Sequence, residues 1–163
     1  MKHKLVEMLA TGFYLGKIPF APGTFGTLLG IPLAWGLVQG GPLFYMFGSI
    51  LFLFFAVGVA ELHELHVGDH DMSEIVIDEV IGYVVTMTWL PQTWQSYLAA
   101  FVVFRFFDIV KPWPVKAIDA KVPGGFGTVL DDVAAGLMAN VVLQVIFFQT
   151  TWLGATYLGA RLG

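Results

Sequence analysis

The sequence predicts an all-α protein, a multi-pass helical membrane bundle of about five to six helices, some of them short or broken. Composition is the first reason. Hydrophobic residues make up 57% of the 163 residues and charged residues 12%, whereas soluble domains carry about 25% charged residues. The second reason is that no alternation of apolar and polar residues persists, as strands would require. Helices satisfy their own backbone hydrogen bonds in hydrocarbon, which favours a helical bundle.

The first uncharged run spans residues 18–60. It is too long for a single crossing, which needs about 20 apolar residues. A turn signal, Gln-Gly-Gly-Pro at residues 39–42, lies within this run. We therefore expect a helical hairpin, with one helix over residues 27–38 and the returning helix over residues 43–60.

The second uncharged run, residues 80–104, is broken by a polar segment with a proline at residues 91–95. This break predicts one helix over residues 80–90 and another over residues 97–110, both short for a full span. The third run offers one clear span at residues 133–150. These lengths leave the number of complete crossings between about three and five.

The length allows a single domain over residues 1–163. A net charge of −4 provides no basic field for nucleic acid. The absence of cysteine excludes disulfides, thiolate metal ligands and cysteine nucleophiles. Basic residues occur in the N-terminal segment 2–17 and in the segment 105–121. If each hairpin returns to its starting side, these segments share one face, and the positive-inside rule predicts that this face is cytoplasmic.

Two pairs of adjacent acids, Asp78-Glu79 and Asp131-Asp132, border apolar stretches that we expect to be helical. Acids at the start of a helix are often only caps, because the helix dipole is positive there. Two such pairs on the same predicted face favour a metal site, since neighbouring anions at a membrane boundary are costly unless a cation joins them. Carboxylate oxygens without thiolate partners suit Mg²⁺ or Mn²⁺.

A third charged motif has Arg105, Asp108 and Lys111 at spacings that place them roughly on one helix face. One interpretation is a local ion-pair ladder at the membrane border, with the long basic side chains reaching water. Asp108 favours a functional interpretation, because it lies between Phe107 and Ile109, and ionisable groups at membrane depth are functional candidates.

Two glycine-rich segments, residues 22–27 and 123–128, match closely in sequence, and each precedes an apolar helix. We expect both to be loops. Loop amides followed by a helix N-terminus form an anion site, and Thr24, Thr27 and Thr128 would add hydroxyl donors. A simple turn before a helix is the alternative for either segment alone.

Three histidines, His63, His66 and His70, are spaced so that they could line one helix face. A zinc site is one interpretation, although no His-Glu-x-x-His pattern is present. A solvated polar helix end is the interpretation that we favour.

Together, the motifs resemble the phosphatidylglycerophosphatase A family over most of the chain, from Gly12 to Leu143. This resemblance implies a multi-pass enzyme of the bacterial inner (cytoplasmic) membrane with its active site facing the cytoplasm. It implies Mg²⁺-dependent hydrolysis of the phosphomonoester of phosphatidylglycerophosphate to phosphatidylglycerol and phosphate, at the membrane interface. The partners would be this phospholipid and the bilayer, with no nucleic acid. The segments that carry the resemblance are residues 21–27, 77–82, 104–112 and 124–132.

The resemblance also implies site residues. The catalytic group would be Asp108, Asp131 and Asp132, and the metal ligands Asp78, Glu79, Asp131 and Asp132. The phosphate-binding group would be Thr24, Gly26, Thr27, Arg105, Lys111, Gly127 and Thr128.

Several alternatives remain open at this point. Asp108 could be a further metal ligand or the base that positions a water molecule. The attack could be direct or pass through a covalent aspartyl phosphate, and one or two metal ions could bind. A small membrane transporter or channel with a functional acidic cluster is the rival from a different class, since intramembrane acids and broken helices occur there too. A membrane scaffold without catalysis is another.

Overall fold

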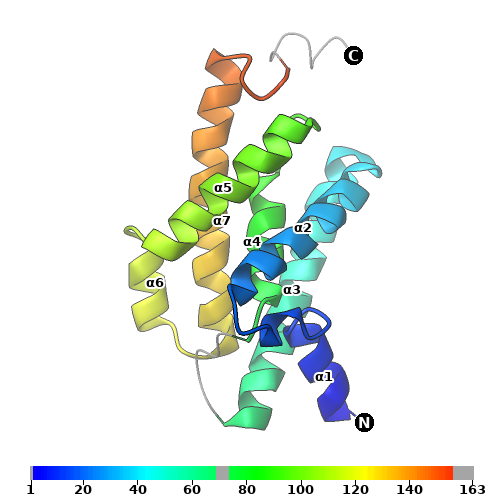
Figure 1. Cartoon of the computed structure of the whole chain (residues 1–163), viewed down its shortest axis with the longest axis vertical. Helices are drawn as coiled ribbons and strands as arrows, with labels where there is room; N and C mark the ends of the chain where they lie inside the picture. Colours follow the sequence, from blue (N-terminus) through cyan, green and yellow to red (C-terminus); the bar gives the residue numbers. More distant parts are fainter. Residues whose placement is uncertain (1, 69–73, 156–163) are drawn as a thin grey trace.

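A computed structural model describes residues 2–68 and 74–155, and every regular element within these ranges is helical (Figure 1). This confirms the all-α prediction. Two short helices, α1 and α6, add to the elements expected from the sequence. In chain order the elements are α1 (Lys2–Ala10), the 3₁₀ turn η1 (Leu15–Lys17), α2 (Pro22–Val38), α3 (Gly41–Val67), α4 (Ile77–Thr86), α5 (Trp94–Val110), α6 (Val115–Lys121) and α7 (Gly124–Gln149).

Both predicted hairpins are present. The turn between α2 and α3 lies at Gln39 and Gly40. The turn between α4 and α5 contains Pro91, and α5 begins after Thr93, whose hydroxyl accepts a hydrogen bond from the Ser96 amide at 3.2 Å. Such a cap satisfies one of the amides that the first turn of a helix leaves without a partner.

The two glycine-rich segments are not loops, and this prediction was wrong. Residues 22–27 form the first turns of α2, and α7 begins at Gly124. Proline fits the first turn of a helix because its missing N–H has no partner there anyway, and Pro22 is in this position. The sequence predicted that Asp131 and Asp132 open their helix, and this was also wrong. The two acids lie about two turns inside α7.

Helix α4 is the centre of the bundle, with α7, α2 and α3 packed around it (Figure 1). Eight of its ten residues are buried. Its C-terminal carbonyl groups are bonded by neighbouring helices. The hydroxyl of Tyr45 donates to the Val84 carbonyl at 2.6 Å, and the Asn140 amide donates to the Thr86 carbonyl at 2.8 Å. These bonds fix the depth and rotation of α4.

Two glycines allow α4 and α7 to touch through their backbones. A Cβ atom on Gly136 of α7 would lie 2.4 Å from the Gly82 carbonyl oxygen of α4. A Cβ atom on Gly82 would lie 2.9 Å from the Asp132 carbonyl oxygen. No side chain fits at either distance. This close approach brings the first turn of α4 beside Asp132.

Helices α3 and α7 are the two in the described part of the chain that are long and apolar enough to cross a membrane. Helix α4 has 10 residues and α5 has 17, in agreement with the expectation that both are short for a full span. One face of α3 carries large apolar side chains with no protein cover. They recur at helical spacing, with exposed fractions of 65% to 73% at Leu43, Phe47, Leu51 and Phe54.

Candidate active site

A cavity of about 660 Å³ is lined by residues of α2, α3, α4, α5, α6 and α7 and of the segments that join them. Most of its polar lining is acidic, and two basic side chains face it from α5 and the residue after it. Carboxylates reach it from α3, α4, α5, α6 and α7. The charged residues that line it are Glu64, Asp78, Glu79, Arg105, Asp108, Lys111, Asp119, Asp131 and Asp132.

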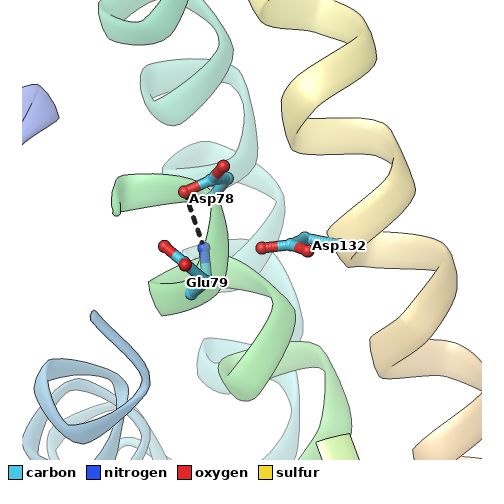
Figure 2. A group of neighbouring side chains, drawn as sticks. All are labelled: Asp78, Glu79 and Asp132. Carbon is cyan, nitrogen blue, oxygen red and sulfur yellow. Dashed lines mark hydrogen bonds between the residues drawn. The ribbon is translucent and has the colours of Figure 1, made fainter. Parts of the chain in front are cut away.

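Three of these acids form a compact group, Asp78 and Glu79 from α4 and Asp132 from α7 (Figure 2). One carboxylate oxygen from each lies within 4.8 Å of the other two. Asp78 and Asp132 are only 7% and 4% exposed. The Glu79 amide donates a hydrogen bond to Asp78 Oδ1 at 3.0 Å. Glu79 Oε2 and Asp132 Oδ2 are buried without any hydrogen-bond partner.

This three-acid group is electrostatically incomplete. Burial raises the pKa of Glu79 to about 8, and the nearby Asp132 adds to the rise. Burial also raises the pKa of Asp78, and the negative charge of Glu79 raises it further. A positive charge close to these groups would favour their ionised forms at neutral pH. Oxygen-only donors with two unpartnered atoms fit a hard divalent cation such as Mg²⁺.

Arg105 bridges this group to Asp108. Its Nη1 lies 2.5 Å from Asp108 Oδ2 and 3.6 Å from Glu79 Oε1. All three side chains are mostly buried. The i, i+3 spacing noted in the sequence therefore produces a direct ion pair, and Asp108 holds the guanidinium over the three-acid group.

Lys111 forms a second bridge on the other side of the cavity. Its Nζ lies 2.7 Å from Asp131 Oδ2 and 2.6 Å from Asp119 Oδ1. These two acids raise the Lys111 pKa, although burial opposes them. Asp131, expected among the metal ligands, is thus held by Lys111 and lies outside the three-acid group.

The glycine-rich segments contribute unequally. Gly127 and Thr128 line the cavity, and the Thr128 hydroxyl donates to Glu64 Oε1 at 3.1 Å. Thr24, Gly26 and Thr27 are not among the lining residues. The Thr27 hydroxyl is buried and donates to the Gly23 carbonyl at 2.8 Å.

Gly23, which the sequence marked only as part of a candidate anion-binding loop, is in close contact with the charged groups. A Cβ atom there would lie 2.1 Å from Glu79 Oε1 and 2.7 Å from Arg105 Nη1. The first turn of α2 therefore presses its backbone against the Glu79–Arg105 pair. The sequence predicted that this segment is a loop presenting amides to an anion, whereas Gly23 lies in the first turn of α2.

Glu64 and Asp119 are further lining residues that the sequence reasoning missed. Glu64 is 3% exposed near the end of α3. His63 and His66 lie away from this cavity. His63 and His66 line a separate cavity with Glu7, Lys17 and Glu74, and His70 lies outside the described residues. His63 and His66 join no group of three potential ligands in the described part of the chain.

The fold and the cavity indicate a helical phosphatase, because clustered carboxylates beside two basic side chains can hold a cation and a phosphate group together. The chain belongs to the phosphatidylglycerophosphatase A family, whose model matches residues 8–147. The resemblance deduced from the motifs is thereby confirmed.

Relatives agree with this assignment over most of their length. The chain is 39% identical to proteins named phosphatidylglycerophosphatase A from Haemophilus influenzae and Escherichia coli, over 86% of this chain in each case and over 88% and 82% of those proteins. It is also 34% identical, over 86% of this chain and 92% of the relative, to a Bacteroides thetaiotaomicron protein provisionally named a phosphatidylinositol-3-phosphatase. No solved structure matches the chain.

Proposed function

We propose that this protein removes the terminal phosphate of phosphatidylglycerophosphate and releases phosphatidylglycerol and inorganic phosphate. The three-acid group beside two basic side chains is the observation that carries the proposal, and its two buried, unpartnered oxygens favour cation binding. The names of the Haemophilus and Escherichia relatives supply the substrate.

In this proposal Asp78, Glu79 and Asp132 hold Mg²⁺. When bound, Mg²⁺ polarises the phosphoryl group and activates a water molecule for attack. The remaining lining residues act on the phosphate and on protons. Arg105 donates hydrogen bonds to the phosphoryl oxygens, where negative charge develops. Asp108 orients Arg105 through one oxygen and accepts the proton of the attacking water through the other.

Lys111, on the opposite side of the cavity, stabilises the oxygen that leaves with the lipid. Asp131 contributes to catalysis by holding this ammonium group in place. Gly127 and Thr128 line the cavity at the start of α7, where the helix dipole favours an anion. Gly26 and Thr27 do not contact the phosphate but help to shape the site. Gly26 leaves room for Glu79 Oε2, and Thr27 bonds to the Gly23 carbonyl.

We also propose that the protein resides in the bacterial inner membrane with the cavity at its cytoplasmic surface. The uncovered apolar face of α3 suits contact with acyl chains. Trp113 is 82% exposed two residues after Lys111, in a position suited to the headgroup region. The acyl chains of a substrate would then remain in the bilayer while its phosphate reaches the cavity.

Phosphate release from defined lipids tests the proposed reaction. Purified protein in detergent should release phosphate from phosphatidylglycerophosphate faster than from phosphatidate or phosphatidylinositol 3-phosphate. The last of these lipids is included because of the name of the Bacteroides relative. Hydrolysis of only one of the comparison lipids would contradict the proposed substrate. Hydrolysis of none of the three lipids would contradict the proposed phosphatase function.

Removal of divalent cations should abolish this activity. We expect EDTA to lower phosphate release more than about 100-fold and added Mg²⁺ to restore it, because the uncompensated acids repel the substrate phosphate. Undiminished hydrolysis after exhaustive chelation would exclude the metal role of the three-acid group.

Gly23→Ala should lower kcat about 10- to 100-fold while the protein remains folded. The added methyl group overlaps Glu79 Oε1 and Arg105 Nη1, so both side chains must shift. Gly36→Ala in the same helix is the matched control, since a Cβ atom there meets nothing within 4 Å. Equal activity of both variants would show that the contact at Gly23 is unimportant.

A further inference from the structure

We propose that Asp119 is a positioning residue that aims the Lys111 ammonium group at the substrate phosphate. The inference rests on the proposed function, and it concerns a residue that the sequence motifs did not mark. Asp119 lies on α6, and its Oδ1 is 2.6 Å from Lys111 Nζ. Asp131 Oδ2 binds the same Nζ from α7, at 2.7 Å.

The two ion pairs of Lys111 leave one hydrogen-bond donor of its ammonium group free. Lysine carries three N–H donors at the end of a flexible stem. Two of them are taken by Asp119 and Asp131, which fixes the direction of the third. Because Lys111 lines the cavity together with Arg105 and the three-acid group, this third donor is available to a phosphoryl or leaving oxygen.

The two acids differ in depth, and this difference favours a positioning role. The Asp131 side chain is 6% exposed, whereas the Asp119 side chain is 39% exposed. Asp131 alone would draw the ammonium group inwards, towards the buried acids. Asp119 counters this pull from the more open side, so the ammonium group stays between the two carboxylates.

Asp119 is also held by a firm scaffold. Helix α6 is anchored by Val115, which is completely buried. At its other end, Val122 lies so close to α7 that a Cβ atom on Gly127 would be 1.9 Å from the Val122 carbonyl oxygen. Both ends of the segment that carries Asp119 are therefore fixed against the bundle.

Two other roles for Asp119 make different predictions. As an ordinary surface ion pair it would contribute little to stability and nothing to turnover. As a competitor for Lys111 it would weaken phosphate binding, and its removal would lower the inhibition constant for inorganic phosphate. A positioning residue must act through Lys111, so its effect disappears when Lys111 is absent.

The test is a double-mutant cycle measured as kcat and KM on phosphatidylglycerophosphate. We expect Asp119→Ala to lower kcat about 10- to 100-fold with a smaller change in KM, and Asp119→Glu to recover part of the loss. In the Lys111→Met background, Asp119→Ala should have no further effect. Glu7→Ala, which breaks the ion pair of Lys17 outside the cavity, is the matched control and should leave kcat unchanged.

The outcomes separate this inference from the proposed function. An inactive wild-type protein refutes the proposed function and the inference with it. An active wild-type protein with unchanged kcat in Asp119→Ala refutes the positioning role alone. Equal losses from Asp119→Ala with and without Lys111 also refute it, as does tighter inhibition by inorganic phosphate in Asp119→Ala.

Discussion

Asp132→Asn is expected to lower phosphate release from phosphatidylglycerophosphate by at least about 1,000-fold. The change preserves the shape of the side chain but removes a charge from the three-acid group. Asp132 Oδ2 is buried and has no hydrogen-bond partner within the protein. In either orientation of the asparagine side chain, its amide nitrogen would also direct N–H groups towards the proposed cation site. The measurement is kcat at saturating Mg²⁺.

The same variant should remain folded, and this separates a lost ligand from a lost structure. Without added metal, the wild-type protein holds these three acids close together, and Asp132→Asn relieves part of their mutual repulsion. Its thermal midpoint in EDTA should therefore equal or exceed that of the wild type. Glu7→Gln removes an acid outside the cavity and serves as the control. Near-normal turnover by Asp132→Asn would remove Asp132 from the metal site.

Gly136→Leu is expected to have the second large effect, by separating α4 from α7. The new side chain would begin 2.4 Å from the Gly82 carbonyl oxygen, where only a hydrogen atom fits. Overpacking of this kind costs about 1–3 kcal/mol of unfolding free energy. Because Gly136 lies about one turn from Asp132, the displacement should also pull Asp132 away from Asp78 and Glu79 and abolish activity.

Thermal unfolding in detergent and phosphate release measure the two parts of this prediction. Gly58→Leu is the control, since Gly58 is helical and a Cβ atom there meets nothing within 4 Å. That variant should have the same thermal midpoint and the same rate of phosphate release as the wild type. Full activity of Gly136→Leu would mean that the contact between α4 and α7 does not set the geometry of the site.

The sequence was sufficient to predict the helical class and both hairpins, because turn residues interrupt runs that are otherwise apolar. It was also sufficient to place Asp78 and Glu79 at a helix start, which the structure confirms. Prolines and glycines at residues 22–27 and 123–128 suggested loops, since a turn glycine and a packing glycine look alike in a sequence. Here Gly23 and Gly127 provide room for close contacts rather than for turns.

The partners of the charged side chains could not be predicted, because they depend on how each helix is rotated in the bundle. The adjacent residues Asp131 and Asp132 point to different partners, Lys111 and the acids of α4. Asp119 approaches Lys111 because α6, which begins after Pro114, packs against α7. Glu64 reaches the cavity because α3 continues beyond its apolar part, to Val67. None of these contacts leaves a periodic signal.

Direct measurement of cation binding tests the central claim most sharply. Mn²⁺ can replace Mg²⁺ among oxygen ligands, and the loss of its free-ion electron paramagnetic resonance signal reports binding without requiring turnover. We predict saturable Mn²⁺ binding by the wild-type protein, competition by Mg²⁺, and loss of that binding in Asp132→Asn but not in Glu7→Gln. Equal Mn²⁺ binding by wild type and Asp132→Asn would contradict the assignment of the cation to Asp78, Glu79 and Asp132.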